Sequence, residues 1–202
     1  MGAFKGKNAK ILTMVVAISV MVVFAYIGFS NKNEQKANEE AQKENITKLD
    51  KTILKNLEEE YPASVHEVIK YYCTVLQCMF SGDATDKQID QLIDKERALF
   101  DKELLKANEY SEFVKGRYAE IKQYKNKNIS MVKFLVDDND NVKYWQNNSA
   151  KMASVKAKIY MGGKQYSSFM QKYVLRQDKD GKWKILSWEN MGEKTDEDKE
   201  EE

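Results

Sequence analysis

The spacing of apolar residues changes once along the chain, near Lys127, and this change limits the possible folds more than any other feature. Before this point, apolar residues recur three and four positions apart, which is typical of amphipathic helices. After it, they alternate with polar residues, which is typical of strands that bury one face. Helices followed by strands indicate an α+β fold. Within residues 61–190 we expect about three helices packed on one face of a curved antiparallel sheet of four to five strands.

Capping signals place the helix starts. Ser64 and Glu67 have the S-x-x-E spacing of a capping box, so Ser64 is the expected N-cap of the first helix. Thr85 and Gln88 have the same spacing at the second helix. Asn108 is the expected N-cap of the third. The apolar face of the first helix comprises Val65, Val68, Ile69, Tyr72, Leu76, Met79 and Phe80.

Alternating segments and one turn signal organise the second half of the chain. The segments with strand periodicity are 129–136, 141–146, 152–161 and 165–176. Gly162 and Gly163 are expected to form a two-residue hairpin turn. The sheet is expected to be basic, because residues 128–188 contain eleven Lys and Arg against five Asp.

The stretch DKDGKWKILSW, residues 178–188, has the D-x-D-G core of a calcium loop but fails as one. If its aspartates take positions three and five, Arg176 stands at position one, and Ser187 at position twelve, which requires glutamate. Asp and Gly between two alternating runs instead predict a hairpin into a last strand. Leu186 and Trp188 fall on the lysine face of that strand, so it either bulges or is covered on both faces.

Residues 11–29 contain no charged side chain, and such a run spans about 28 Å as a helix, which matches a bilayer core. We expect an uncleaved, single-pass transmembrane helix over residues 11–30 that contacts the lipid bilayer. The alternative is a cleaved signal peptide. Because a short N-terminal tail usually stays inside, residues 1–10 are expected in the cytoplasm and residues 31–202 outside the cell membrane.

Charged segments flank the expected domain on both sides. Residues 31–60 lack Gly, are rich in Glu, Lys and Gln, and are expected to form a solvated helical stalk. A short apolar stripe within residues 46–57 leaves weak homodimerisation through the stalk as an alternative. Residues 191–202 carry seven acids and two lysines, which predicts a disordered, solvated tail. The alternative is that this tail screens the basic sheet.

Candidate reactive residues are few. Cys73 and Cys78 lie five apart on one expected helix and point about 140° away from each other, so they cannot form a disulfide together. We expect buried thiols, with an intermolecular bridge through Cys78 as the alternative. His66 is the one histidine of the chain, so we expect no His-based metal site, and no cofactor. A net charge of +1 argues against a nucleic-acid partner.

Four motifs carry a resemblance to known proteins: YPASVHEVIKYY, RALFDKELLKAN, EIKQYK and VLRQDKDGKWKILSW. They resemble a family of membrane-anchored proteins of low-GC Gram-positive bacteria, over about residues 57–190. The order of helices and strands also resembles the nuclear-transport-factor-2-like, cystatin-like fold. That resemblance implies a cone-shaped domain with an apolar pocket between helices and sheet. The fold occurs in isomerases, dehydratases, ligand-binding modules and inner-membrane components of type IV secretion machines, so it does not determine function.

Two functions are compatible with these features. The first is a non-catalytic extracytoplasmic module that binds or assembles a protein or cell-envelope partner. The alternative is a small-ligand binder or isomerase-like enzyme, which requires an open pocket with a buried acid near Tyr72, Asp101 or Tyr160. Asp101 has a competing structural interpretation as a helix cap or salt-bridge partner. No catalytic residue is assigned, because the chain contains no recognisable catalytic motif.

Overall fold

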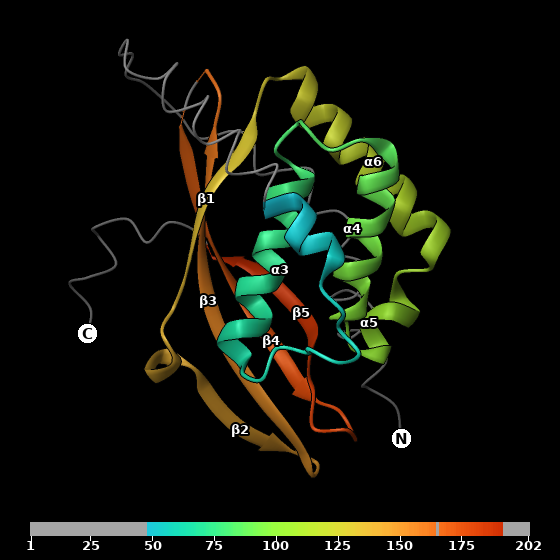
Figure 1. Ribbon diagram of the computed structural model, residues 1–202. Coiled ribbons are helices and arrows are strands. Elements are labelled where there is room, and N and C mark those ends of the chain that lie inside the picture. Colours follow the sequence, from blue (N-terminus) through green and yellow to red (C-terminus); the bar gives the residue numbers. More distant parts are fainter. Residues whose placement is uncertain (1–47, 165, 192–202) are drawn as a thin grey trace, which may run out of the picture.

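The computed structural model describes residues 48–164 and 166–191 (Figure 1). The expected transmembrane helix, residues 11–30, lies outside the described residues, as do most of the expected stalk and most of the acidic tail. Within the described ranges, no helix combines the length and the apolar composition that a membrane span requires. A short helical stretch at residues 48–54 precedes the main helices.

The first main helices begin where their capping signals predict. The helices are α3 (Val65–Met79), α4 (Asp86–Ala98), α5 (Lys102–Ala107) and α6 (Tyr110–Asn126). The Ser64 hydroxyl accepts a hydrogen bond from the Glu67 amide, at 3.2 Å. In return, the Glu67 carboxylate accepts from the Ala63 amide, one residue earlier than a standard box requires. At Thr85 the capping box with Gln88 is complete, so both predicted starts are confirmed.

The start of the last helix differs from the prediction. Asn108 is not the N-cap of α6 but the C-cap of the short helix α5, and its Nδ2 donates to the Leu104 carbonyl at 2.9 Å. Glu109 caps α6 instead, because its carboxylate accepts from the Ser111 and Glu112 amides. An asparagine amide donates as well as accepts, so its sequence position alone does not decide which helix end it serves.

One antiparallel sheet follows the helices in the described part of the chain. Its strands are β1 (Ser130–Val136), β2 (Lys143–Asn147), β3 (Ala150–Gly162), β4 (Ser167–Gln177) and β5 (Trp183–Met191). The order across the sheet is β1-β3-β4-β5, and β2 also pairs with β3. β1 pairs with the second half of β3 and β2 with its first half. The long central strand therefore carries two short neighbours on one side.

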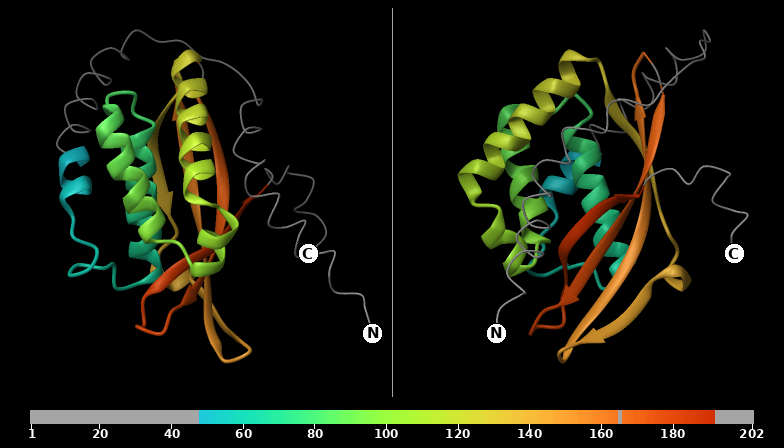
Figure 2. Two further views of the ribbon diagram at one scale, coloured as in Figure 1. Left: turned by 90° about the vertical axis from the view of Figure 1, so that its right-hand side faces the viewer. Right: turned by 180° about the vertical axis from the view of Figure 1, so that it is seen from behind.

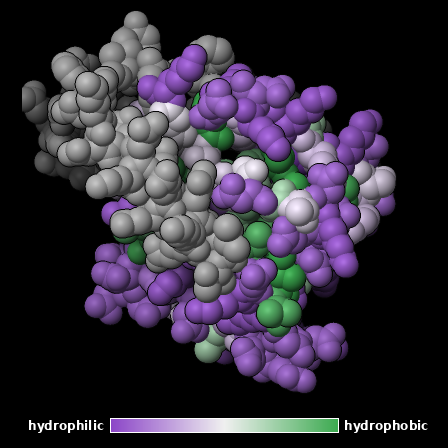
Figure 3. Space-filling view, turned by 45° about the horizontal axis from the view of Figure 1, so that its top comes forward, coloured by the Kyte–Doolittle hydropathy of each residue, from purple (hydrophilic) through white to green (hydrophobic). Residues whose placement is uncertain are grey.

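The helices cover one face of this sheet (Figures 1 and 2), which confirms the predicted α+β architecture. On β3 the buried residues of that face alternate as predicted: Ala153, Val155, Ala157, Ile159 and Met161. At the centre of the core, Tyr72 of α3 lies edge-on against Tyr173 of β4, with ring centroids 5.6 Å apart. The rings of Phe100 and Trp188 complete this aromatic group. Among the coloured residues of Figure 3, hydrophilic ones make up most of the visible surface.

The hairpin predicted at Gly162 and Gly163 does join β3 to β4, but more than two residues separate its last pair, Met161 and Ser167. Asn148 and Ser149 connect the paired ends of β2 and β3, and both have positive φ angles, of 45° and 69°. Positive φ at both central residues is the signature of a type I′ turn, which matches the twist of antiparallel strands. The two-residue turn was predicted at the wrong hairpin because glycine was taken as the turn signal, whereas asparagine also tolerates this conformation.

Gly162 and Gly163 instead allow two backbone segments to approach each other. A Cβ atom on Gly163 would lie 2.4 Å from the Asn128 carbonyl oxygen. One on Gly162 would lie 2.7 Å from the Cγ1 atom of Val132. Gly162, the last residue of β3, therefore packs against β1 itself, and Gly163, the first residue after β3, passes close to the segment that enters β1.

The stretch at 178–188 is a hairpin followed by a strand, as predicted. The Asp178 carboxylate accepts hydrogen bonds from the Asp180 and Lys182 amides, at 3.0 and 2.8 Å. Gly181 has a φ of +77°, which glycine adopts without strain. The aspartate of the calcium-like motif is therefore used to hold the turn.

The structure also resolves the two alternatives for β5. Successive β4 residues pair with Ile185 and Ser187, so Leu186 is skipped and the strand bulges. After the bulge the side-chain alternation is shifted by one position. Trp188 therefore pairs with Tyr173 on the face that the helices cover, although simple alternation predicts it on the lysine face.

Candidate functional site

A cavity of about 60 Å³ lies between α3, α6 and the sheet, where the resemblance predicts a cone-shaped pocket. Its apolar walls include Tyr72, and its polar groups come from Arg117 and Glu120 of α6 and from Gln171 and Asn190 of the sheet. A buried water needs about 10–15 Å³, so about four waters would fit. Pockets for small molecules run to about 300–1,000 Å³. The protein's own side chains therefore fill most of the space between the helices and the sheet.

Arg117 occupies the helix side of this cavity with two carboxylates. Its Nε donates to Glu96 Oε2 at 3.0 Å, its Nη2 donates to the other Glu96 oxygen, and its Nη1 donates to Glu120 at 2.5 Å. Glu96 is fully buried. The guanidinium also lies 5.3 Å from the Phe113 ring centroid and 5.9 Å from that of Phe80. Every charge of this triad therefore has a partner of opposite sign.

The charges of the triad shift one another's pKa values. Burial alone would lower the pKa of Arg117, but Glu96 and Glu120 outweigh burial and hold that pKa above its ordinary value. Burial raises the pKa of Glu120, and the charge of Arg117 offsets only part of that rise. Arg117 therefore stays charged, and Glu120 is the acid that takes up a proton more readily than a solvated glutamate does.

The structure does not bring the three predicted pocket residues together. Tyr72 is 2% exposed and lies in the wall of the cavity. Asp101 caps α5 and accepts a hydrogen bond from Arg176 Nε at 3.0 Å, so it serves as both a cap and a salt-bridge partner. Tyr160 lies on the outer face of the sheet, between the amines of Lys133 and Lys158 at 5.8 and 5.5 Å from its ring centroid.

The charged residues of the cavity were missed from the sequence. One signal was present: Arg117 interrupts the apolar face of α6 between Phe113 and Ile121, and it is one of only three arginines in the chain. An arginine is rarely buried without a paired carboxylate. Nothing local indicates Glu96 as that carboxylate, because it lies 21 residues earlier on another helix.

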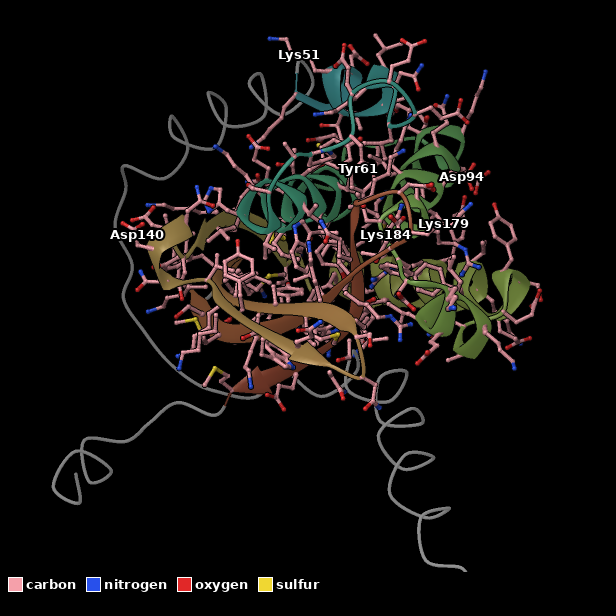
Figure 4. All side chains as sticks on the ribbon, turned by 90° about the horizontal axis from the view of Figure 1, so that it is seen from below. Lys51, Tyr61, Asp94, Asp140, Lys179 and Lys184 are labelled. Atoms are coloured by element: carbon pink, nitrogen blue, oxygen red, sulfur yellow. The ribbon has the colours of Figure 1, made fainter. Side chains whose placement is uncertain are left out.

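A second hollow, of about 600 Å³, lies between the turn from α4 to α5 and the hairpin of β4 and β5. Its rim carries the cations Arg97, Lys102, Arg176, Lys179 and Lys184 and the acids Asp101, Asp178 and Asp180. The Lys184 amine donates to the Ala98 carbonyl at 2.7 Å and lies 4.4 Å from the Tyr61 ring centroid (Figure 4). Burial lowers the pKa of Lys184. These contacts connect structural elements, and the buried acid of this hollow, Asp101, is paired with Arg176.

The outer face of the sheet, away from the helices, concentrates positive charge and exposed apolar groups. We call Lys133, Leu135, Lys156, Lys158, Tyr160, Met170 and Lys172 the outer-face cluster, because their strand registers place them on neighbouring rows of this face. In one row Lys156 lies directly opposite Lys172. Like charges in that position repel each other. Glu189, on the other side of Lys172, forms an ion pair with it, with 3.2 Å between Lys172 Nζ and Glu189 Oε1.

The thiols and the histidine have structural positions. Cys73 and Cys78 are both free and buried on α3, so in this conformation Cys78 is not accessible for a bridge to another chain. The Nδ1 atom of His66 lies 2.8 Å from the Asp137 carbonyl oxygen and ties α3 to the end of β1. Within residues 48–164 and 166–191, no group of three metal-ligating side chains is present.

Comparison with known proteins identifies a family but no activity. No curated protein matches this chain. One family model, described as "Domain of unknown function (DUF6715)", matches residues 1–188. The match includes the apolar run at residues 11–29 together with the helices and the sheet. The chain therefore belongs to the family described as Domain of unknown function (DUF6715).

Proposed function

We propose that this chain is a membrane-anchored, extracytoplasmic, non-catalytic module that binds a protein or cell-envelope partner through the outer face of its sheet. Residues 11–30 would span the bilayer, and residues 31–60 would hold the domain away from it. Residues 61–190 would form the nuclear-transport-factor-2-like, cystatin-like cone. A family match that runs from residue 1 through the sheet supports treating the apolar run and the domain as parts of one functional unit.

The near-complete filling of the cone carries this proposal. About 60 Å³ remains in it, which is far below the volume of a small-molecule pocket. A catalytic acid or base also needs access to its substrate and freedom to transfer a proton. Both oxygens of Glu96 and one oxygen of Glu120 accept hydrogen bonds from Arg117. The interior is therefore better suited to holding the helices on the sheet than to chemistry.

The outer face supports binding to an acidic partner. The strands carry eight cations and one acid, Glu189, and four of these cations, Lys133, Lys156, Lys158 and Lys172, belong to the outer-face cluster. Leu135, half exposed, adds apolar area beside the lysines. Lysines around exposed apolar side chains fit a partner surface that presents carboxylates or phosphates around an apolar centre.

The alternative function, a small-ligand binder or isomerase-like enzyme, has one observation in its favour. Glu120 is a largely buried acid with a raised pKa, and it lines the same cavity as Tyr72. The volume of that cavity is the observation against it. Ligand binding would require Tyr124 and its neighbours on α6 to move away from the sheet.

Cross-linking in native membranes tests the proposed function. The full-length chain would carry Lys156→Glu, Lys158→Glu and Lys172→Glu on the outer face. A matched control would carry three charge reversals on exposed lysines of α4 and α6: Lys87→Glu, Lys115→Glu and Lys122→Glu. Since each exposed ion pair contributes about 0.2–1 kcal/mol, three reversals should reduce recovery of a specific partner at least about threefold, while the control recovers it normally.

Equal recovery by both triple variants would exclude the outer face as the binding surface. The topology is tested separately, by adding protease to intact cells. The proposed orientation requires cleavage within residues 31–202. Protection of this entire range would place the domain on the cytoplasmic side and exclude an extracytoplasmic partner.

A further inference from the structure

We propose that the acidic segment 192–202 of this chain binds across the outer face of its own sheet and competes there with the partner. The segment has the sequence GEKTDEDKEEE, with seven acids and two lysines. The proposal adds regulation to the binding surface named under the proposed function. Its competition with a partner rests on that function. Binding of the segment itself is a property of the isolated chain, so its test does not need a partner.

The charges of the outer face call for an anionic occupant. Lys156 and Lys172 face each other across β3 and β4, and this arrangement is unfavourable unless negative charge lies nearby. Within the described part of the chain, the ion pair of Lys172 with Glu189 is the one ion pair that the outer-face cluster makes. Lys133 and Lys158 lie beside the Tyr160 ring instead. Three of these four amines thus have no carboxylate partner among the described residues.

The register of the sheet places the start of the segment in line with these amines. Met191, the last residue of β5, pairs with Met170 of β4. Met170 pairs with Lys158 of β3, and Lys158 pairs with Leu135 of β1. These four residues form one row across the outer face. The segment therefore begins at one end of a row that crosses the cluster.

The segment is long enough to follow this row. Neighbouring strands lie about 4.8 Å apart, so the three steps from β5 to β1 cover about 14 Å. Eleven extended residues reach up to about 36 Å. The segment can therefore cross the whole sheet with residues to spare, and its seven acids can approach every amine of the cluster.

Attachment to β5 gives the segment an advantage over a free peptide. A tethered binding segment acts at an effective concentration of about 1 mM, so even weak charge pairs keep it on the face for part of the time. A partner must then displace it. Binding of the partner would be strongest when the segment is removed, neutralised or occupied elsewhere, which makes the segment an internal competitor.

Zero-length cross-linking of the purified full-length chain tests whether the segment occupies the face. A carbodiimide joins a carboxylate to an amine only when the two are in contact, and mass spectrometry identifies the linked peptides. At low salt we expect links from residues 193–202 to Lys133, Lys156, Lys158 and Lys172. Exposed amines of α4 and α6, at Lys87, Lys115 and Lys122, serve as internal controls. About 1 M salt should abolish the outer-face links, because it shortens the screening length to about 3 Å.

Poly-L-glutamate, used as a probe anion, measures the competition. A variant in which Glu193, Glu197, Glu200, Glu201 and Glu202 become Gln, and Asp196 and Asp198 become Asn, keeps the length of the segment and removes its negative charge. We expect this variant to bind the probe about fivefold more tightly than the native chain at low salt, equivalent to about 1 kcal/mol. Adding Lys156→Glu and Lys158→Glu to the neutral variant should remove that gain.

Two results would overturn the inference. One is an even distribution of links over the outer face and the helix controls. The other is equal probe affinity of the native and neutral-segment chains, including the absence of binding by both. If instead the segment links to the face but no partner is recovered from membranes, the inference stands and the proposed function fails. The two proposals can therefore be separated experimentally.

Discussion

Arg117 shows what residue-scale sequence reasoning can and cannot reach. The caps at Ser64 and Thr85 were predictable, because a capping interaction joins residues three positions apart. Arg117 binds Glu96, 21 residues earlier, and that pairing depends on how α4 and α6 pack. The two interpretations of Asp101, as a helix cap and as an ion-pair partner, were both confirmed. The positions of Asp101, Tyr72 and Tyr160 do not support a pocket shared by the three.

The buried triad gives a prediction about stability. Glu96→Gln keeps the shape of the side chain but leaves the Arg117 charge without its main partner in the interior. Removing one member of a buried pair costs about 3–5 kcal/mol, so we expect a loss of about 3 kcal/mol, with Glu120 retaining part of the compensation. Urea denaturation would measure it.

Glu112→Gln is the matched control, because Glu112 lies on the exposed side of α6. It should change the free energy of unfolding by less than about 0.5 kcal/mol. A Glu96→Gln variant as stable as this control would mean that the triad contributes little to folding.

At the scale of elements, glycine illustrates why a local signal can be misassigned. A Gly-Gly pair between two alternating runs is a turn signal. Gly162 and Gly163 are needed here because a Cβ atom at either position would clash with atoms of residues 132 or 128. That requirement comes from tertiary packing, which a local pattern does not contain. The bulge at Leu186 was predictable as one of two alternatives, because a bulge changes the alternation of the side chains themselves.

Two glycine-to-alanine substitutions should have opposite effects. In Gly163→Ala the new Cβ would meet a backbone oxygen at 2.4 Å, so the segment entering β1 must shift, and we expect a loss of about 2 kcal/mol. In Gly116→Ala, inside α6, the new Cβ meets nothing within 4 Å. Alanine is the better helix former, so we expect a gain of about 1 kcal/mol.

Thermal and urea denaturation of the two variants would measure both effects. The comparison controls for the chemistry of the change, since both substitutions add one methyl group. Destabilisation by Gly116→Ala, or tolerance of Gly163→Ala, would contradict the assignment of these glycines to an open helix surface and a close approach.

For the whole molecule, the sequence predicted the α+β class and the helix-covered sheet. It did not predict the strand order, because the pairing of β1 and β2 with opposite halves of β3 depends on contacts far apart in the chain. It also gave no indication that the space between the helices and the sheet would be nearly full. Filling depends on the joint packing of aromatic rings from α3, β4, β5 and the connection between α4 and α5: Tyr72, Tyr173, Trp188 and Phe100.

Buried tyrosines and a buried thiol predict loss of stability at alkaline pH. Burial raises the pKa values of Tyr72 and Tyr173 well above normal, and that of Cys73 to about 12. Between each ordinary pKa and its raised value, the folded state binds more protons than the unfolded state. Stability is therefore complete below about pH 9 and falls as the pH rises further.

Urea denaturation at about pH 8 and about pH 11 would measure this fall. Tyr173→Phe should reduce it, because one group that resists ionisation is removed. Tyr144→Phe, at an exposed ring on β2, should leave it unchanged. Equal stability of the native chain at both pH values would contradict the burial of these hydroxyl groups.

The two free thiols give this molecule an intrinsic chemical reporter of its own opening. Cys73 and Cys78 lie on the helix that packs against the centre of the sheet, at 0% and 1% exposure. A thiol reagent reacts with the thiolate, and burial raises both pKa values, so modification requires α3 to separate from the sheet. We expect slow modification in buffer and fast modification in urea, followed by mass spectrometry. The modification rate would then measure how often α3 separates from the sheet, without any engineered label. Fast labelling of Cys78 in buffer would show that α3 separates from the sheet without unfolding of the whole domain.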